Sequence, residues 1–533
     1  MPHETTNPEQ EANAGDRPVR IVLDDRRMSL DGLDSAWGHA VRVEITDETW
    51  KRIEAGHESV RRIVAGDQTA YGINTGFGPL CTKRISTDQL ETLQRNLIMS
   101  HAVGVGDPVP PEIVRWIMLL KLRGLCHGVS GISRATLSCL ADLLNADVLP
   151  VIPTQGSLGA SGDLAPLAHM VLPMIGLGTV TANGRVEPAA KALKRAGIHP
   201  VTLGPKEGLA LINGTQFMAA YASAIAVRAR RLVKHVDVVA TMSLEGMMGS
   251  IGPFHEKLHQ LRPYVGAMQS AQNVRRMMAG SEILASHADC TRVQDPYSIR
   301  CVPQVHGATR DALRHAIDII ETEINAVTDN PLIVDGEVLS GGLFHGQSLA
   351  LVLDYLAMAL SELASISERR TYLLLTGENP GAPGRGGVAE LPLLLMKDTG
   401  LNSGFMLPQY TAAALVSENK GLCTPACVDS IPTALGQEDH VSMGARSAVK
   451  CYQILKNVET VLAIEQMCAA QAIDYRAPLS PGVGPRTAHA EFRKDVSHAE
   501  ADRLIGEDIS KSLALLRSQR IVRSVENEIG PLA

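Results

Sequence analysis

Hydrophobic residues recur with helical spacing over long segments of the chain. Four apolar residues share one face between Leu313 and Ile324, and polar residues from Thr328 onward are expected to end that helix. The segment 349–366 is apolar nearly all round, which is typical of a helix buried inside a bundle. The same spacing predicts further long helices over 447–472 and 498–518. We therefore expect a mainly α fold.

Shorter elements are predicted before these helices. Residues 19–23 and 41–45 are short β-like runs. An amphipathic helix is predicted over 47–65, with Thr46 as its N-cap. Residues 180–186 are expected to form a small hairpin with Asn183-Gly184 at its turn.

Glycines and prolines divide the next helical segments. The pattern predicts a helix over 111–144 that is broken at Gly128 and Gly131, and a buried helix over 167–177. From Glu207 onward the pattern is long and helical. We divide the chain into three regions, with a boundary near Gly204: a polar, disordered tail over 1–18, an N-terminal domain over 19–204, and a long-helix bundle over 205–533.

Composition narrows the class of protein. Hydrophobic residues make up 45% of the 533 residues and aromatic residues only 3%, a balance that favours helix over sheet. The net charge is −7, and no basic block indicates nucleic-acid binding. The apolar run 209–227 is interrupted by polar residues, so we read it as a buried helix and expect no membrane partner.

Cysteine usage indicates a reducing compartment. The nine cysteines are scattered, and the closest pair, Cys423 and Cys427, has no second pair or histidine cluster to complete a zinc site. The first 18 residues lack the apolar core of a signal peptide. We therefore expect a cytoplasmic protein with reduced thiols and no metal.

Ala160-Ser161-Gly162 can carry unusual chemistry. In a tightly bent backbone, the amide nitrogen of Gly162 can attack the carbonyl carbon of Ala160, and loss of water closes a five-membered imidazolone. Loss of a second water from Ser161 leaves an exocyclic methylidene, an electrophile made from protein alone. Glycine tolerates the bend and alanine does not hinder it. Three small residues alone favour a plain turn, such as a phosphate-cradling loop, over this chemistry.

The longer run decides between these interpretations. Gly159-Ala160-Ser161-Gly162-Asp163-Leu164-Ala165-Pro166-Leu167 resembles the signature of the aromatic amino acid ammonia-lyase and aminomutase family, whose members carry a 4-methylidene-imidazol-5-one (MIO) group. The resemblance extends over about 47–515. It implies a mainly α, fumarase/aspartase-like fold with an MIO-bearing N-terminal domain and a long central helical bundle. It also implies a homotetramer whose active sites combine several chains, with no metal or soluble cofactor.

The resemblance assigns a catalytic base to Tyr71. This residue opens the glycine-rich loop 71–79, and family members carry a tyrosine at this place. A phenol has a reference pKa of about 10, so nearby positive charge or helix N-termini must lower that pKa for catalysis near neutrality. The alternative is a packing role for Tyr71.

His101 is the predicted reader of the substrate ring. Ser100-His101 resembles the histidine-specific members of the family, whereas tyrosine-selective members have His-Leu and many phenylalanine-selective members Phe-Leu at the aligned pair. One imidazole can hydrogen-bond another through either nitrogen. The alternative is a structural histidine.

Further substrate contacts follow from other motifs. Asn213, in Leu211-Ile212-Asn213-Gly214-Thr215, is expected to hold the substrate near the MIO group. Arg300 offers a fork for the substrate α-carboxylate, with Gln294 and Tyr297 beside it. For Asn213 and Arg300 alike, the alternative is a purely structural role.

Two motifs test how closely the chain follows the family. Phe344 is expected at the substrate, but Leu343 before it replaces a common asparagine. Glu418 matches an acidic residue that approaches the substrate imidazole in histidine-specific members, although other members carry it too. The glycine-rich segment 378–390 also departs from those members. Residues 437–443 match the family, and we read them as a turn that supports the active site.

The predicted reaction removes ammonia across Cα and Cβ of an aromatic amino acid. Histidine, giving urocanate, is the leading substrate. The alternatives are a 2,3-aminomutase, a tyrosine or phenylalanine ammonia-lyase, and, from another class, a non-catalytic helical scaffold. The sequence does not choose between capture of the amine and attack on the ring by the MIO group.

Overall fold

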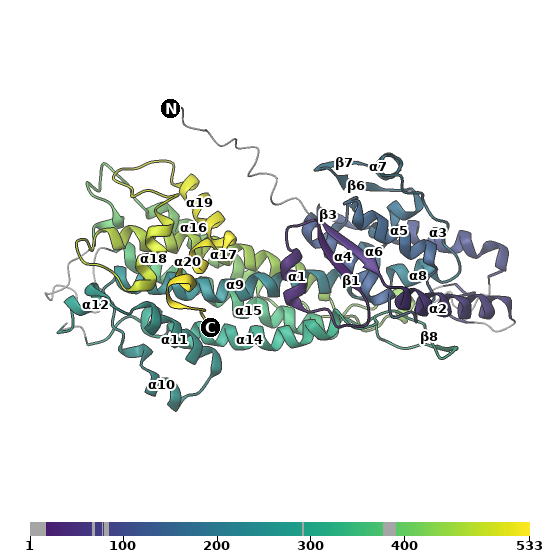
Figure 1. Cartoon of the computed structure of the whole chain (residues 1–533), viewed down its shortest axis with the longest axis horizontal. Coiled ribbons are helices and arrows are strands. Elements are labelled where there is room, and N and C mark those ends of the chain that lie inside the picture. Colours follow the sequence, from purple (N-terminus) through teal and green to yellow (C-terminus); the bar gives the residue numbers. More distant parts are fainter. Residues whose placement is uncertain (1–17, 67–69, 77, 79–84, 290–292, 377–390) are drawn as a thin grey trace, which may run out of the picture. The chain divides into compact units, whose positions relative to one another are not determined.

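The computed structural model describes residues 18–66, 70–76, 78, 85–289, 293–376 and 391–533 (Figure 1). The predicted tail, apart from Pro18, and the glycine-rich segment 378–390 lie outside these residues. Helices dominate and strands are few and short, which confirms the mainly α prediction. The chain forms two compact units: unit 1 contains 1–227, 317–353 and 425–449, and unit 2 contains 228–316, 354–424 and 450–533.

Each unit is made of separate chain segments, whereas the predicted domains follow one another along the sequence. The boundary near Gly204 therefore stays a prediction. Unit 1 contains the N-terminal strands and helices together with the starts of α9 (Gln216–Gly246) and α15 (Gln347–Leu375).

The first elements of unit 1 match their predictions. Strands β1 (Val19–Leu23) and β2 (Val41–Ile45) pair in parallel, and α1 (Leu30–Ala36) connects them. Helix α2 (Asp47–Ala65) begins where predicted, because the Thr46 hydroxyl oxygen accepts a hydrogen bond from the Thr49 N–H at 3.3 Å.

The predicted break between two buried helices is also confirmed. Helix α4 (Pro111–Leu125) and helix α5 (Arg134–Asn145) are separated by a turn in which Gly128 and Gly131 have φ of 78° and 74°. A Cβ on Gly131 would lie 2.3 Å from a methyl group of Val60, so α2 packs closely against this turn. Helix α3 (Leu90–His101) precedes this pair.

Small sheets flank the loop that contains Ala160-Ser161-Gly162. The predicted hairpin is confirmed as β6 (Thr179–Ala182) and β7 (Arg185–Pro188), with Asn183 and Gly184 both at positive φ. The buried helix predicted over 167–177 begins earlier, as α6 (Leu164–Val171), and ends in the 3₁₀ turn η3 (Leu172–Ile175). The remaining short elements of unit 1 are β3 (Val105–Pro108), β4 (Leu149–Pro150), β5 (Pro153–Gln155), α7 (Ala189–Ala196), α8 (Glu207–Ile212), β8 (Leu332–Val334), β9 (Glu337–Leu339), η2 (Thr87–Gln89) and η6 (Ala434–Gly436).

The longer parts of α9, α14 (Val302–Glu323), α15 and α17 (Gly444–Asp474) belong to unit 2, and Figure 1 labels these helices. Buried polar pairs join them, including the ion pair between Arg370 and Glu465 and the pair between Arg310 and Asp237. The predictions over 349–366 and 447–472 are confirmed by α15 and α17. The shorter helices of this unit are α10 (Glu256–Leu261), α11 (Val265–Met277), α12 (Glu282–Ser286), α13 (Tyr297–Arg300), α16 (Met406–Leu422), α18 (Val483–Phe492), α19 (Ile505–Ser518), α20 (Arg520–Ile529), η4 (Gly252–Phe254) and η5 (Leu393–Leu395).

Two helix boundaries differ from their predictions. Helix α14 ends at Glu323 rather than at Thr328, and the Thr328 hydroxyl instead accepts a hydrogen bond from the Gln216 amide at 2.8 Å. Helix α19 begins at Ile505 rather than at His498.

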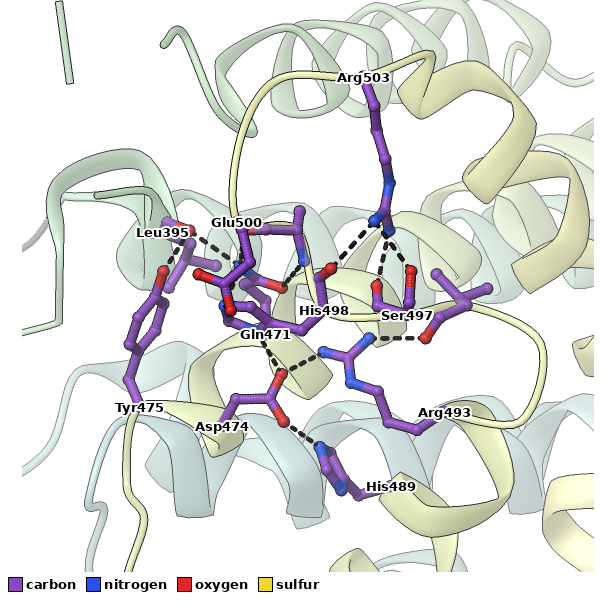
Figure 2. A network of polar contacts seen from close by, with 12 residues as sticks. Leu395, Gln471, Asp474, Tyr475, His489, Arg493, Ser497, His498, Glu500 and Arg503 are labelled. Atoms are coloured by element: carbon purple, nitrogen blue, oxygen red, sulfur yellow. Dashed lines mark hydrogen bonds and ion pairs between the residues drawn. The ribbon is translucent and has the colours of Figure 1, made fainter. Parts of the chain in front are cut away.

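Figure 2 shows the polar network around Asp474, in which residues 498–503 take part before α19 begins. The Asp474 carboxylate, at the end of α17, bonds His489 and His498 at 2.7 Å each and Arg493 at 2.6 Å. The Gln471 side chain, one turn earlier, bonds both backbone groups of Ala499. These bonds hold residues 498–499 against α17, and the next helix, α19, begins only at Ile505.

Among the described residues, α15 is the helix that is long and apolar enough to span a membrane by length and composition. Its most apolar window is 61% buried inside the structure, as expected for a core helix of a bundle.

Candidate active site

The backbone around Ala160-Ser161-Gly162 is tightly bent. Gly159 and Gly162 form an antiparallel bridge with each other, and their φ angles are +81° and +74°. Gly162 also bridges to Gly214 in the parallel sense. A Cβ on Gly162 would lie 2.1 Å from the Gly214 carbonyl oxygen, so glycine is required at this close approach.

Hydrogen bonds hold this turn on both sides. The Asp163 N–H donates to the Gly214 carbonyl at 2.7 Å, and the Gly214 N–H donates to the Ser161 carbonyl at 3.2 Å. On the other side, the Met443 N–H donates to the Leu158 carbonyl at 2.9 Å. The turn is therefore fixed from both the Gly214 side and the 442–443 side.

Asp163 follows the turn and is fully buried. Its carboxylate accepts hydrogen bonds from the Met218 N–H at 3.0 Å and the Ser157 hydroxyl at 3.4 Å. Burial raises the pKa of Asp163 to about 7, although these hydrogen bonds favour the ionised form. Asp163 can thus gain or lose a proton near neutral pH directly beside the tripeptide.

A cavity of about 860 Å³ in unit 1 opens onto the turn. Ala160 and Ser161 line it. Five further predicted site residues or their neighbours reach the same cavity: Tyr71, Ser100, His101, Asn213 and Phe344.

Tyr71 enters the cavity from a compact turn. Its phenol oxygen accepts a hydrogen bond from the Gly78 N–H at 3.3 Å. The next residue, Gly72, has φ of +69°, and a Cβ there would lie 2.5 Å from a methyl group of Leu209. Close packing of the loop against α8 therefore sets the position of Tyr71.

His101 is the last residue of α3, and its surroundings favour the neutral form of its ring. Burial lowers its pKa, while the Leu97 carbonyl and the charge of Glu438 act in the opposite direction. The Ser100 hydroxyl donates to the Leu97 carbonyl at 3.1 Å and lies 3.0 Å from His101 Nδ1. With the Ser100 proton directed at the Leu97 carbonyl, a neutral His101 ring carries its proton on Nδ1 and leaves Nε2 as an acceptor.

Asn213 presents an unsatisfied polar atom. The residue is 3% exposed, and its side-chain Oδ1 has no hydrogen-bond partner among the residues that the structure describes. Buried polar atoms are normally paired, so an unpaired oxygen at a cavity wall indicates a place for a ligand donor.

Glu438 lies opposite the turn. Ser161 Oγ donates to its Oε1 at 3.5 Å, and Thr433 Oγ1 donates to its Oε2 at 2.9 Å. His345 and His440 also line the cavity, with their rings stacked at 5.6 Å between centroids. The cavity therefore combines a neutral imidazole, a carboxylate, a phenol and an unpaired amide oxygen around Ser161.

Residues 28–494 match the sequence profile of the family described as aromatic amino acid lyase. The chain belongs to the aromatic amino acid lyase family. It is 47% identical to a histidine ammonia-lyase of Gloeobacter violaceus over 514 residues, which cover 96% of this chain and 98% of that protein.

Solved structures agree with this membership. The crystal structure of histidine ammonia-lyase from Trypanosoma cruzi has a TM-score of 0.87 and 41% identity, and the match covers 96% of both chains. Tyrosine aminomutase from Streptomyces globisporus has a TM-score of 0.89 and 32% identity, covering 97% of this chain and 100% of that one. As an aromatic amino acid lyase, the chain is an enzyme of the carbon–nitrogen lyase class.

Four predicted site residues lie in unit 2 and are not among the described residues that line this cavity. Gln294 and Arg300 line a second cavity of about 800 Å³, where the Arg300 guanidinium donates to the Gln294 side-chain oxygen. Tyr297 beside them is 71% exposed. Glu418, on α16, accepts a hydrogen bond from the Asn457 amide at 3.0 Å. Their roles toward the substrate stay predictions.

Three further residues line the cavity although the sequence alone assigns none of them an individual role: Glu438, His345 and His440. The motif 437–443 is predicted only to form a turn that supports the active site. A comparison of this motif with the family is the signal that could have identified Glu438 as a cavity residue. Leu343, which replaces the usual asparagine, is 57% exposed and is absent from the described lining of the cavity, whereas Phe344 after it is part of that lining.

Proposed function

We propose that this aromatic amino acid lyase removes ammonia from L-histidine and releases urocanate. One observation carries the choice of histidine: His101 lines the same cavity as Tyr71 and Ser161, and its neutral ring leaves Nε2 as an acceptor for a substrate N–H. The 47% identity to a histidine ammonia-lyase over nearly the whole chain supports the same choice.

The residues present fit an MIO group made from Ala160-Ser161-Gly162. The turn is already bent, and a Cβ at Gly162 would collide with the Gly214 backbone, so the turn accommodates glycine and no larger residue. When formed, this group supplies an electrophile, which no ordinary side chain offers. No metal is part of the proposal.

The side chains around the cavity have separate tasks. Tyr71 takes the substrate β-proton as general base. The unpaired Oδ1 of Asn213 accepts a hydrogen bond from the substrate amine, and His101 fixes the imidazole ring. Glu438, bonded to both Ser161 and Thr433, adds negative charge that favours a positively charged amine nearby.

We further propose a cytoplasmic homotetramer whose active sites combine residues of several copies. In that assembly Arg300 grips the substrate carboxylate, with Gln294 and Tyr297 beside it, while Phe344 and Glu418 complete the surroundings of the ring. Exposed apolar side chains on α15 and α16 support self-association: Tyr355 is 47%, Leu407 52% and Tyr410 57% exposed.

A 2,3-aminomutase or a tyrosine or phenylalanine ammonia-lyase is the second candidate. The likeness to a tyrosine aminomutase, with Leu343 in place of asparagine, favours it. His101 weighs against phenylalanine, whose ring offers no hydrogen-bond donor to Nε2, and the pair Ser100-His101, in place of His-Leu, weighs against tyrosine.

The test is a product analysis of the purified enzyme with histidine, tyrosine and phenylalanine in separate incubations. We expect urocanate and ammonia from histidine and little or no turnover of phenylalanine, since a site built for a ring nitrogen can discriminate by up to about 10⁴–10⁵-fold. His101→Phe should lose histidine turnover. Ser161→Ala is the matched control, which should fold normally and lose nearly all activity on every substrate. Deamination of tyrosine with histidine ignored, or a β-amino acid as the product, would overturn the proposal.

A further inference from the structure

Lys121 is a buried amine whose closest contact is a backbone carbonyl. The residue lies on α4 and is 2% exposed. Its Nζ donates to the Asn213 carbonyl oxygen at 2.6 Å and lies 3.5 Å from the side-chain oxygen of Gln216. Burial of an ammonium group is costly unless strong partners compensate for the lost water. The contact with the Asn213 carbonyl is therefore unusual enough to require an explanation.

The peptide unit that Lys121 contacts also contacts the tripeptide. The Asn213 carbonyl and the Gly214 N–H belong to one planar peptide group. At one end of this plane the carbonyl accepts from Lys121, and at the other end the N–H donates to the Ser161 carbonyl at 3.2 Å. A cation at the carbonyl polarises the peptide and strengthens its N–H as a donor.

Burial and the neighbouring charges both act on the pKa of Lys121. Burial lowers its pKa to about 7, with Asp329 and Asp163 raising it and Lys206 lowering it. Lys206 itself forms a buried ion pair with Asp329 at 2.7 Å. Asp329 is thus already paired, and the Asn213 carbonyl remains the closest partner of Lys121.

We propose that Lys121 is a positioning residue for formation of the MIO group: through the Asn213–Gly214 peptide it holds and polarises the hydrogen bond to the Ser161 carbonyl. This inference rests on the proposed function, because it concerns the maturation of that same site.

The chemistry explains why the Ser161 carbonyl matters. Before it forms a bond to the Ala160 carbonyl carbon, the Gly162 nitrogen loses its proton, and the charge of the resulting amidate is shared with the Ser161 carbonyl oxygen. A donor at this oxygen stabilises the charge that develops there. The Ala160 oxygen leaves as water with the protons of the Gly162 and Ser161 nitrogens. A second water takes the Ser161 hydroxyl and α-hydrogen, so no oxidant is needed.

The experiment measures the mass of the peptide that contains residues 160–162. Full-length wild type and Lys121→Met are synthesised in a short pulse, and the folded, soluble fraction is digested at successive times. We expect wild type to lose two waters from this peptide and Lys121→Met to do so at least about ten-fold more slowly, because donors to a developing oxyanion are typically worth 10²–10³-fold and Lys121 acts through another group. Lys121→Gln, which keeps a neutral donor, covers the case in which the methionine variant yields no folded protein.

A matched control separates this effect from loss of a buried charge in general. Lys450 in unit 2 is 3% exposed, pairs with Asp354 and donates to the Thr424 carbonyl. Lys450→Met should be destabilised yet dehydrate its tripeptide at the wild-type rate. Wild-type rates in both neutral Lys121 variants would overturn the role of Lys121 alone, whereas an undehydrated wild type would instead overturn the proposed MIO group.

Discussion

Gly214→Ala is expected to destabilise the protein strongly, because the site excludes a Cβ in two ways. The residue has φ of +120°, a conformation that side chains other than glycine rarely adopt. A Cβ would also lie 2.5 Å from Thr328 Oγ1 and 2.7 Å from Gln216 Oε1. These two side chains hydrogen-bond each other at 2.8 Å, so neither moves aside without loss of that bond.

The expected magnitude follows from these two costs. Strained backbone contributes about 1–3 kcal/mol, and overpacking of a buried site about 1–3 kcal/mol more. Gly197→Ala is the matched control, since Gly197 has φ of +69° but nothing lies within 4 Å of the point that a Cβ would occupy there. The control should lose only the backbone cost of about 1–2 kcal/mol.

Urea unfolding, followed by circular dichroism, measures both variants. We expect the midpoint of Gly214→Ala to fall clearly below that of Gly197→Ala, and the 160–162 peptide of Gly214→Ala to keep its two waters. Equal midpoints for the two variants, together with a fully dehydrated peptide, would refute the tight fit of Gly214 against the tripeptide.

Two further predictions concern the base and the network of Figure 2. Tyr71→Phe should keep the fold and lower turnover by at least about 10²–10⁴-fold in steady-state assays, because it removes the general base; turnover within a few-fold of wild type would exclude Tyr71. Although burial alone would raise the pKa of Asp474, hydrogen bonds from His489 and His498 and the charge of Arg493 hold that pKa well below its ordinary value. The ionised Asp474 therefore stabilises the fold above its unfolded-state pKa of about 3.9, and this stabilisation is lost as the pH falls toward its folded-state pKa. Asp474→Asn should cost about 2 kcal/mol at neutral pH and flatten the acid limb of urea-unfolding midpoints between about pH 5 and 2; an unchanged acid limb would contradict this assignment.

The sequence pattern correctly predicted the elements whose ends are set by residues close by in the sequence. Thr46 caps α2 through a hydrogen bond three residues away, and Asn183-Gly184 forms its hairpin turn within four residues. The long apolar segments likewise became α15 and α17. The start of α19 was wrong because Gln471 and Asp474, far away in sequence, hold residues 498–499.

Long-range contacts also limited prediction of the site. The motif around Ser161 identified the tripeptide, but Glu438 approaches it from 277 positions away. Lys121 is flanked by leucines, and nothing near it in sequence indicates that its partner is the Asn213 carbonyl. The family resemblance supplied Tyr71, His101 and Asn213, which line one cavity with Ser161.

The proposed removal of ammonia requires the electrophile at Ser161. Digestion of active wild-type enzyme and mass spectrometry of the peptide that contains Ala160-Ser161-Gly162 measures it without reference to any substrate. We predict a mass lower than the sequence mass by two waters, and an unmodified mass for this peptide in fully active enzyme would contradict the account.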